Sequence, residues 1–500
     1  MALELGRAFA QSVAMKDIAS IFRARRWPSP VLGASLGLAA AVATLAGCAS
    51  TEPSAAAAEP IDTEAQLASF DQVWSTVKEQ HYDPEMVGES WDEAREVYRP
   101  QIAEAETEAE VRRVINRMLG TLGQSHFGVI PATSYEALES EDDGGGEGRL
   151  GVRVRLHDVD GEPSAVVTDV RAGSAADEAG IEPGWVLLEI NGDPVADLIE
   201  RLGSIENGVA RLETTAALNV QRRLAGEVGE EIELVALDRA DARREMSVVL
   251  GEAAGELATF GNLPPMPLSI ETKTLDGGIA YFSFDIFLNP PRVIRELREA
   301  TSAAQGAPGF VLDLRGNLGG IAAMTNGVAG FFTDRRGLNL GEMKTRTSTI
   351  RLPVNPRRGA YLGPVAVLVD EASISSAEIL PAGMQQLGMA RVFGTRTAGL
   401  ALPSNVSRLP SGDGFQYVFA SLVSPNGEPV EGDGVLPDTV VETTRDHLIR
   451  GRDPVLEAAT AWLLEQDGER PAPAEAPEDI SFRGSENRSV AGLDAPIAAP

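Results

Sequence analysis

The stretch PVAVLVDEASISSAEILPAGMQQLGMARVFGTRTAGLALP, residues 364–403, decides how the C-terminal half of the chain folds. It opens with a continuous apolar run, Pro364 to Val369, as a strand buried on both faces requires. Small and polar residues follow, and helical composition begins at Ala377. A serine at such a strand-to-helix turn is exposed for nucleophilic attack, and the N–H of the next residue points at the developing oxyanion. Because serines are also common helix N-caps, this stretch alone leaves both roles open.

Two earlier segments repeat the succession of strand and helix. Residues 277–287 and residues 309–314 each have the pattern of a strand, and a helical pattern follows each of them. The repeat predicts an α/β core with largely parallel strand pairing. The second strand leads into the pair Gly319-Gly320, where glycine lets the backbone approach a ligand closely. The N–H of Gly319 or Gly320 is therefore a candidate oxyanion donor beside that of Ser376, although a plain strand–helix turn also uses glycines.

Residues 67 to about 131 have the periodicity of helices. Apolar side chains such as Phe70, Val73 and Val77 recur there at helical spacing. The pattern predicts a small helical domain that ends in the sequence LGQSHFGV, residues 122–129.

Between residues 149 and about 250 the pattern is β-rich with one short helix, and an acidic, glycine-rich linker at 137–148 precedes it. The segments GRLGVRVRL, GSAADEAGI and GWVLLEING resemble, in that order, the loop, short helix and following strand of a PDZ domain. The resemblance implies that Leu150, Gly151 and Val152 bind a substrate tail, because such a loop takes the terminal carboxylate while the extended peptide adds as a strand. A generic β-sandwich is the alternative.

The composition narrows the classes of function. A formal net charge of -31 leaves no basic surplus to neutralise phosphates, so no nucleic-acid partner is expected. The single cysteine excludes an internal disulfide and a Cys-rich metal site. The four histidines lack ligand spacings such as H-E-x-x-H. We therefore expect neither a metal nor an organic cofactor.

The N-terminal residues have the pattern of an export signal. Arginines at 23, 25 and 26 precede an apolar run at 31–46, which is short for a membrane-spanning helix. The ending Leu-Ala-Gly-Cys resembles the bacterial lipobox, which implies cleavage before Cys48 and lipidation of its thiol. Several acyl chains would anchor the protein stably, and Ala49-Ser50 favours the periplasmic face of the outer membrane. An uncleaved anchor helix is the alternative.

The order of these segments resembles the C-terminal processing peptidase and tricorn-core superfamily of serine proteases. The motifs DLRGNLGG, SISSAEI, GTRTAG and VEGDGVLPD follow the helical and PDZ-like regions as they do in that superfamily, and the resemblance covers roughly residues 67–459. It implies a crotonase-like ββα protease core. In the processing-peptidase branch a lysine is the base, and aligning that pattern makes Ser375 the nucleophile and puts Leu400 at the lysine position. Because no lysine follows Lys344, this sequence cannot form that Ser–Lys dyad.

The tricorn-core branch uses a Ser-His pair and a glutamate instead, and Ser125, His126 and Glu431 match it. The resemblance implies that His126 deprotonates Ser375 and that Ser125 holds the imidazole tautomer. Glu431 would then accept from Ser125 and stabilise the cation. The alternatives are a structural role for His126 at a helix end and a solvated turn carboxylate at Glu431, with Asp433 in its place.

We therefore expect a multi-domain α/β protein that acts as a membrane-tethered periplasmic serine endopeptidase. It would cut polypeptides near free C-termini or in unfolded segments, and the sequence leaves open whether it forms oligomers. The rivals are a catalytically inactive PDZ adaptor and a ligand-binding lipoprotein with the same core. The predicted organisation is a signal peptide (1–47), a lipidated cysteine with its tether (48–66), a helical domain (67–136), a linker (137–148), a PDZ domain (149–252), a protease core (265–466) and a disordered tail (467–500).

Overall fold

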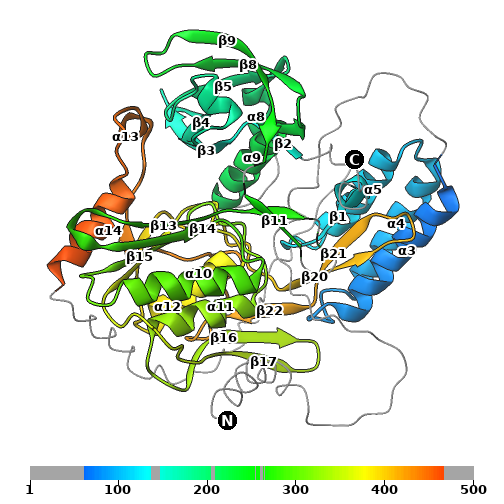
Figure 1. Ribbon diagram of the computed structural model, residues 1–500. Helices are drawn as coiled ribbons and strands as arrows, with labels where there is room; N and C mark the ends of the chain where they lie inside the picture. The colour runs from blue at the N-terminus through cyan, green and yellow to red at the C-terminus, as the bar shows by residue number, and fades with distance from the viewer. Residues whose placement is uncertain are drawn as a thin grey trace, which may run out of the picture. The chain divides into compact units, whose positions relative to one another are not determined.

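The structure is a computed structural model that describes residues 61–136, 147–203, 209–253, 255–259, 263 and 265–466 (Figure 1). The predicted signal peptide, residues 48–60 of the predicted lipidated cysteine and tether, most of the linker and the C-terminal tail lie outside the described residues. Within the described part, every helix is too short or too polar to cross a membrane.

Three amphipathic helices form the N-terminal region: α3 (Thr63–Gln80), α4 (Glu89–Glu104) and α5 (Glu108–Gly120). Side chains at two of the helix starts accept backbone N–H groups, Asp62 from Ala65 and Thr107 from Glu110. The apolar faces of the helices meet in one cluster, which includes Phe70, Val73, Val77, Trp91, Ile102, Val111, Ile115 and Met118.

This helical region does not close on itself, because a strand from the core completes it. Strand β1 (Gly128–Ile130) pairs antiparallel with β21 (Gly414–Val418), and the buried Phe415 belongs to the helical cluster. Arg112 on α5 donates to both oxygens of Asp413, over 3.0 Å each. The turn that carries Ser125-His126 is therefore held against the core from both sides.

The PDZ domain is an antiparallel sheet of strand order β3-β4-β5-β8-β9, with β6 paired to β5. Its helices are α7 (Ala175–Glu178), α8 (Val195–Gly203) and α9 (Val209–Arg223). The prediction of one short helix was therefore wrong, because buried residues such as Leu198, Ile199, Ala216 and Val220 place α8 and α9 over the apolar face of the sheet. The strands are β3 (Val152–Val159), β4 (Glu162–Val170), β5 (Val186–Ile190), β6 (Asp193–Pro194), β8 (Glu231–Leu237) and β9 (Arg243–Val249).

The predicted α/β core is built on a sheet of strand order β13-β14-β15-β18-β19-β23. Every neighbouring pair is parallel except β13–β14, so the predicted parallel pairing is confirmed. The strands are β13 (Ile270–Thr274), β14 (Ala280–Phe284), β15 (Phe310–Asp313), β18 (Val365–Val369), β19 (Arg391–Gly394) and β23 (Thr439–Val440).

Helices cover both faces of this sheet, which explains the uninterrupted apolar run in β18 (Figure 1). Val365, Val367 and Val369 face the cluster beneath α10 (Pro290–Ala303), α11 (Ala323–Ala329) and α12 (Ser376–Gln386). Ala366 and Leu368 face α14 (Pro454–Glu465) instead.

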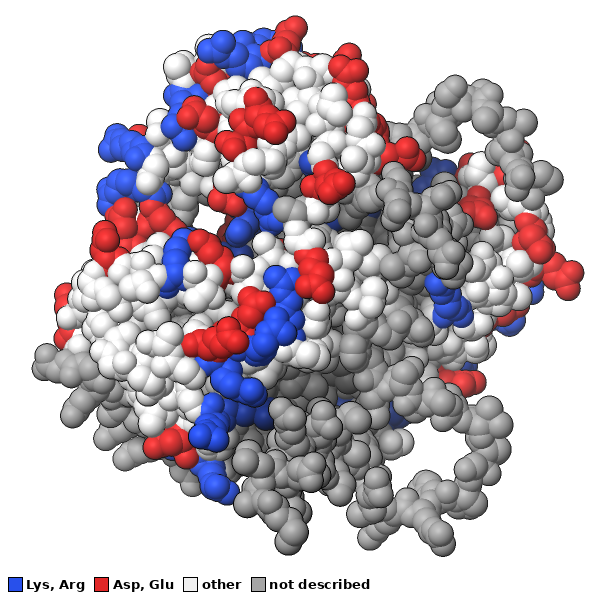
Figure 2. All heavy atoms as spheres, viewed as in Figure 1, with Lys and Arg blue, Asp and Glu red and all other residues white. Residues whose placement is uncertain are grey.

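A second, smaller sheet, of order β17-β16-β22, and the three strands β1-β21-β20 connect the core to the N-terminal helices. These strands are β16 (Leu338–Thr345), β17 (Thr349–Val354), β20 (Ser404–Arg408) and β22 (Ala420–Val423). The remaining elements are α6 (Thr133–Glu136), β2 (Glu147–Arg149), β7 (Ala225–Glu227), β10 (Gly251–Glu252), β11 (Glu256–Ala258), β12 (Met266–Leu268), η3 (Asp276–Gly278), η4 (Gly330–Phe332) and α13 (Arg445–Ile449). On the face shown in Figure 2, acidic and basic side chains are interspersed.

Candidate active site

Ser375 lies at the sharp turn between β18 and α12. Its backbone adopts φ 58° and ψ −114°, a conformation that L-residues rarely occupy and that costs of order 1–3 kcal/mol. The turn is held because the Ser375 N–H donates to the carbonyl of Leu400 over 2.9 Å. The residue is buried, with 3% of its surface exposed. Ser375 thus lies in a strained strand-to-helix turn and is also the N-cap residue of α12, where it forms a capping box with Glu378.

A buried carboxylate at Glu378 holds this turn, and the sequence analysis did not single it out. It accepts from the N–H groups of Ser375 (3.0 Å), Gly399 (2.7 Å) and Leu400 (2.9 Å), and from the hydroxyl of Thr397 (2.5 Å). Burial raises the pKa of Glu378 to about 7, although these hydrogen bonds act in the opposite direction. The S-x-x-E spacing of a capping box was the available sequence signal.

The glycine loop after β15 lies directly against the nucleophile. A Cβ atom on Gly319 would come within 2.8 Å of the Ser375 Cβ, at a φ of +82°. The Gly319 N–H donates to Asn317 Oδ1 (2.9 Å), so it could serve an oxyanion only if that bond opened. The Ser376 hydroxyl donates to the Gly320 carbonyl (3.0 Å), which fixes the two predicted donors Gly320 and Ser376 beside each other.

An arginine braces the start of that loop. Arg315 donates to Asp313 at the end of β15 (2.6 Å) and to Asp453 before α14 (2.8 Å). Burial alone would raise the pKa of Asp313, but the charge and hydrogen bonds of Arg315 outweigh it and the pKa is lowered. Arg315 thereby fixes the end of β15, the start of the glycine loop and α14 to one another.

Ser125, His126 and Glu431 form one hydrogen-bonded relay. The Ser125 hydroxyl lies 2.6 Å from His126 Nδ1 and donates to Glu431 Oε2 over 2.9 Å. Because a hydroxyl has one proton, its second bond requires that Nδ1–H of His126 be the donor. That tautomer leaves Nε2 as the imidazole atom with a lone pair. Asp433 is exposed, so the relay selects Glu431 over this alternative.

The relay and the nucleophile meet at residues 400 and 401. Glu431 Oε2 also accepts the N–H of Ala401 (2.8 Å), and the preceding residue, Leu400, accepts the N–H of Ser375. The segments around residues 125 and 375 are more than 200 positions apart in sequence. Hydrogen bonds therefore connect both of them to the same two residues, 400 and 401.

The position that aligns with the lysine of the processing peptidases is apolar here. Leu400 is buried in a small cluster with Ile374, Ala398 and Leu218, and Leu218 comes from α9 of the PDZ domain. No lysine follows Lys344 in the sequence. A lysine base at the position of Leu400 is therefore excluded.

The PDZ domain also touches the segment that leads to the nucleophile. The Arg155 guanidinium on β3 binds Asp370, with its Nη2 atom 2.9 Å from Oδ2, and lies 3.6 Å from Glu371. Thr214 on α9 donates to the carbonyl of Glu371 over 2.5 Å. Burial, and then the neighbouring Asp370, raises the pKa of Glu371. The acidic pair after β18 is thus where the two domains are joined.

The predicted tail-binding loop lies at the start of β3. Gly151 has φ +86°, and a Cβ there would overlap Ser174, so the close approach requires glycine. The Leu150 N–H donates to Leu224 and the Val152 carbonyl accepts from Gln221. A cleft of about 240 Å³ runs from this loop to residues 316 and 318 beside the glycine loop of the core.

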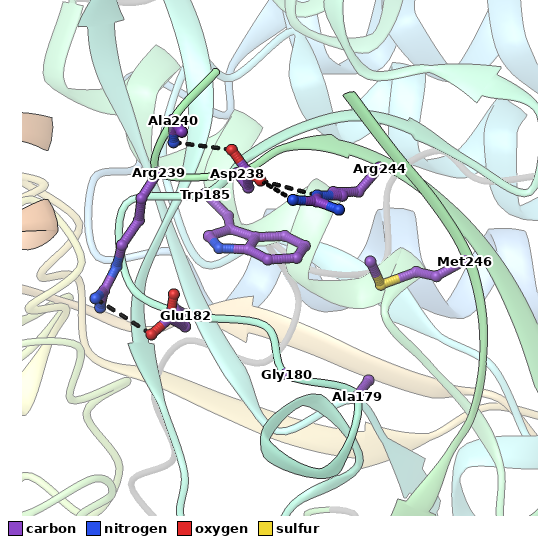
Figure 3. Close-up of a pocket in the computed structure, with 9 residues that line it drawn as sticks. All are labelled: Ala179, Gly180, Glu182, Trp185, Asp238, Arg239, Ala240, Arg244 and Met246. Carbon is purple, nitrogen blue, oxygen red and sulfur yellow. Dashed lines mark hydrogen bonds and ion pairs between the residues drawn. The ribbon is translucent and has the colours of Figure 1, made fainter. Parts of the chain in front are cut away.

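A larger cavity, of about 470 Å³, lies elsewhere on the PDZ domain (Figure 3). The indole of Trp185 forms its floor, between the ion pairs Arg239–Glu182 (3.2 Å) and Arg244–Asp238 (2.6 Å). None of the predicted site residues lines this cavity, so its larger volume does not mark it as the candidate active site. Among the described residues no cluster of His, Cys, Asp or Glu has the arrangement of a metal site.

Three protein-family models match the chain. The model of the tricorn protease C1 domain matches residues 64–120, that of the PDZ domain residues 139–202, and that of peptidase family S41 residues 278–441. The C1 match ends shortly before Ser125-His126, and the S41 match contains Ser375 and Glu431.

Known proteins and structures show the same likeness. A putative tricorn protease homolog 2 of Streptomyces coelicolor is 26% identical over 421 residues, which cover 79% of this chain and 32% of that protein. A carboxyl-terminal-processing protease of Synechocystis sp. is 25% identical over 391 residues, which cover 74% of this chain and 80% of that protein. The chain thus spans about a third of the first relative's length and most of the second's.

Two solved structures share the fold over four-fifths of the chain. The photosystem II D1 C-terminal processing protease has a TM-score of 0.52 at 21% identity, over 81% of this chain and 99% of that one. Mature CPAF has a TM-score of 0.56 at 15% identity, over 82% and 99%. The chain therefore joins regions that match the tricorn protease C1 domain, the PDZ domain and peptidase family S41, it is similar to a carboxyl-terminal-processing protease and to a putative tricorn protease homolog, and it is a serine-type peptidase.

Proposed function

We propose that the chain is an endopeptidase that forms an acyl-enzyme on Ser375 with His126 as general base. The observation that carries this proposal is the bond of the Ser125 hydroxyl to both His126 Nδ1 and Glu431. That arrangement fixes the tautomer in which Nε2 accepts a proton, and it places a carboxylate where it stabilises the imidazolium.

In the first half of the reaction, Ser375 Oγ attacks the carbonyl carbon of the scissile bond and its proton passes to His126 Nε2. The resulting oxyanion accepts from the N–H of Ser376 and from a glycine N–H of the loop at 319–320. The tetrahedral intermediate then collapses, the C–N bond breaks, and His126 returns the proton to the leaving amine.

In the second half, a water molecule gives its proton to His126 and attacks the acyl carbon. The ester bond to Ser375 breaks, the serine oxygen regains the proton, and the new carboxylate leaves. Between Gly319 and Gly320, the second is the better candidate donor, because the Gly319 N–H is already bonded to Asn317.

The proposed substrates are polypeptides with a free C-terminus or an unfolded segment. The PDZ domain and the name of the carboxyl-terminal-processing relative support this class. We further propose that lipid on Cys48 tethers the enzyme to the periplasmic face of the outer membrane, which rests on the sequence motif alone.

Incubating the chain that begins at Ala49 with an unstructured protein, and reading the products by mass spectrometry, tests the proposal. We expect Ser375→Ala and His126→Ala each to lower the rate by at least about 10³-fold. His447→Ala, which removes the same atoms from α13, serves as the control and should keep full activity. Cleavage that survives His126→Ala would refute the choice of base. An unreactive chain that still binds tail peptides would instead favour the adaptor.

A further inference from the structure

The outer edge of strand β3 is where an extended peptide would join the PDZ sheet. Strand β3 is the terminal strand of the order β3-β4-β5-β8-β9, and β4 pairs with one of its edges. The other edge begins beside the tail-binding loop and carries the carbonyl of Val152 and both the N–H and the carbonyl of Val154. A peptide that adds as a strand would bond to these three groups.

Side chains of the domain already occupy all three groups. Gln221 on α9 donates from Nε2 to the Val152 carbonyl (2.8 Å), and its Oε1 accepts the Val154 N–H (3.1 Å). Arg155 Nη1 donates to the Val154 carbonyl (2.9 Å). The amide of Gln221 thus presents to β3 one donor and one acceptor, as the backbone of a bound tail would.

We propose that Gln221 holds the peptide-binding edge of the PDZ domain closed and that a substrate tail binds by displacing it. The proposal rests on the proposed function, in which the domain captures polypeptide tails. The occupant would be an extended peptide with a free terminal carboxylate. The cleft beside this edge supports that choice, because Gly151 and four arginines are among the residues that line it, against the three acidic residues Asp169, Glu252 and Asp285.

Closure of this kind lowers the apparent affinity for the tail. For a ligand that binds only the open form, the apparent dissociation constant is the intrinsic constant divided by the fraction of molecules in that form. Loss of the Gln221 amide removes two hydrogen bonds from the closed form. It removes none of the hydrogen bonds between β3 and a bound tail. Alanine is compatible with the helix, and Ala216 and Val220 still anchor α9 in the PDZ cluster.

Peptide affinity measures the effect directly. The probe is a fluorescent peptide of about ten residues with an apolar last residue and a free carboxylate, read by anisotropy against the full chain carrying Ser375→Ala. We expect Gln221→Ala to bind the probe about tenfold more tightly. Gln386→Ala, which removes the same atoms from the exposed end of α12, should leave the affinity unchanged. A C-terminally amidated peptide should bind weakly to every form.

Hydrogen exchange at the Val154 N–H provides a second measurement. It should quicken in Gln221→Ala without peptide and slow again when the probe is added. A folded Gln221→Ala chain with unchanged or weaker affinity would overturn the proposal, as would the absence of binding by every form. Labelling of Ser375 by a fluorophosphonate in the otherwise native chain tests the protease separately. If Ser375 is labelled but no form binds the probe, only the proposal of the closed edge is contradicted. If the probe binds but Ser375 is not labelled, only the proposed protease activity is contradicted.

Discussion

At the scale of single residues, Ser125 carries the most specific chemistry. Its hydroxyl bonds to both His126 Nδ1 and the Glu431 carboxylate, and the residue is 5% exposed. A serine in this place orients the histidine as an aspartate does in the ordinary triad, but passes the charge on to a carboxylate one bond further away.

Replacing Ser125 by alanine should lower kcat about a hundredfold with little change in KM, because the imidazole loses the partner that fixes its tautomer. Ser125→Thr keeps a hydroxyl and should restore part of the rate. Ser164→Ala, on β4 of the PDZ domain, is the control. Steady-state kinetics on an unstructured peptide measure both parameters. A Ser125→Ala enzyme with the native kcat would contradict the relay.

Glu378 should make stability depend on pH. Its pKa is about 7 in the folded chain, above the ordinary glutamate value of 4.5, so the unfolded chain loses its proton first as the pH rises. The contribution of Glu378 to the free energy of unfolding therefore falls by about 3 kcal/mol in total between about pH 4.5 and pH 7. Above pH 7 this contribution is constant. Glu378→Gln should lack this component. Denaturant unfolding of both chains at pH 5, 6, 7 and 8 measures the difference, and a difference independent of pH would contradict the prediction.

At the scale of elements, the strand, turn and helix around Ser375 could be predicted from sequence, because local patterns encode them. The apolar run of β18 and the small residues after it are sufficient to predict this strand and the turn that follows it. The donors that surround Glu378 come from residues 397–400, and no local pattern indicates that contact. The bond between Ser125 and Glu431 joins residues 306 positions apart, so only the family resemblance suggested it. Helix α9 was missed because its apolar residues were taken as part of a β-rich region.

The loop after β15 offers a sharp test of packing against the nucleophile. Gly319 and Gly306 have nearly the same φ, +82° and +84°, but only at Gly319 would a Cβ meet other atoms within 4 Å. We expect Gly319→Ala to slow fluorophosphonate labelling of Ser375 more than tenfold. Gly306→Ala pays the same backbone strain, about 1 kcal/mol, and should label normally. Equal labelling of both variants would show that the loop yields without affecting Ser375.

At the scale of the whole molecule, the base depends on how the N-terminal helices dock. Asp413 has a side chain that is 4% exposed and is paired with Arg112 on α5. The β1–β21 pairing beside it carries the chain from His126 into the core. The catalytic geometry is therefore a product of docking as well as of the turn itself.

Arg112→Leu should cost about 3 kcal/mol of stability, because it leaves a buried carboxylate without its cation. It should also lower kcat although Arg112 touches no catalytic group. Arg117→Leu, on the exposed side of the same helix, is the control and should change neither quantity by much. Thermal unfolding and steady-state kinetics measure the two effects. A destabilised enzyme with the native kcat would show that docking does not position His126.

The split of the relay between residues 125 and 431 also has a consequence for biosynthesis. The ribosome makes the proposed base His126 first, the proposed nucleophile Ser375 about 250 residues later, and Glu431, which bonds to Ser125, later still. Strand β21, which holds β1 in place, is also made late. A growing chain therefore contains no complete relay until most of its length has been synthesised, and it should be unable to digest its neighbours or itself while it is still unfolded.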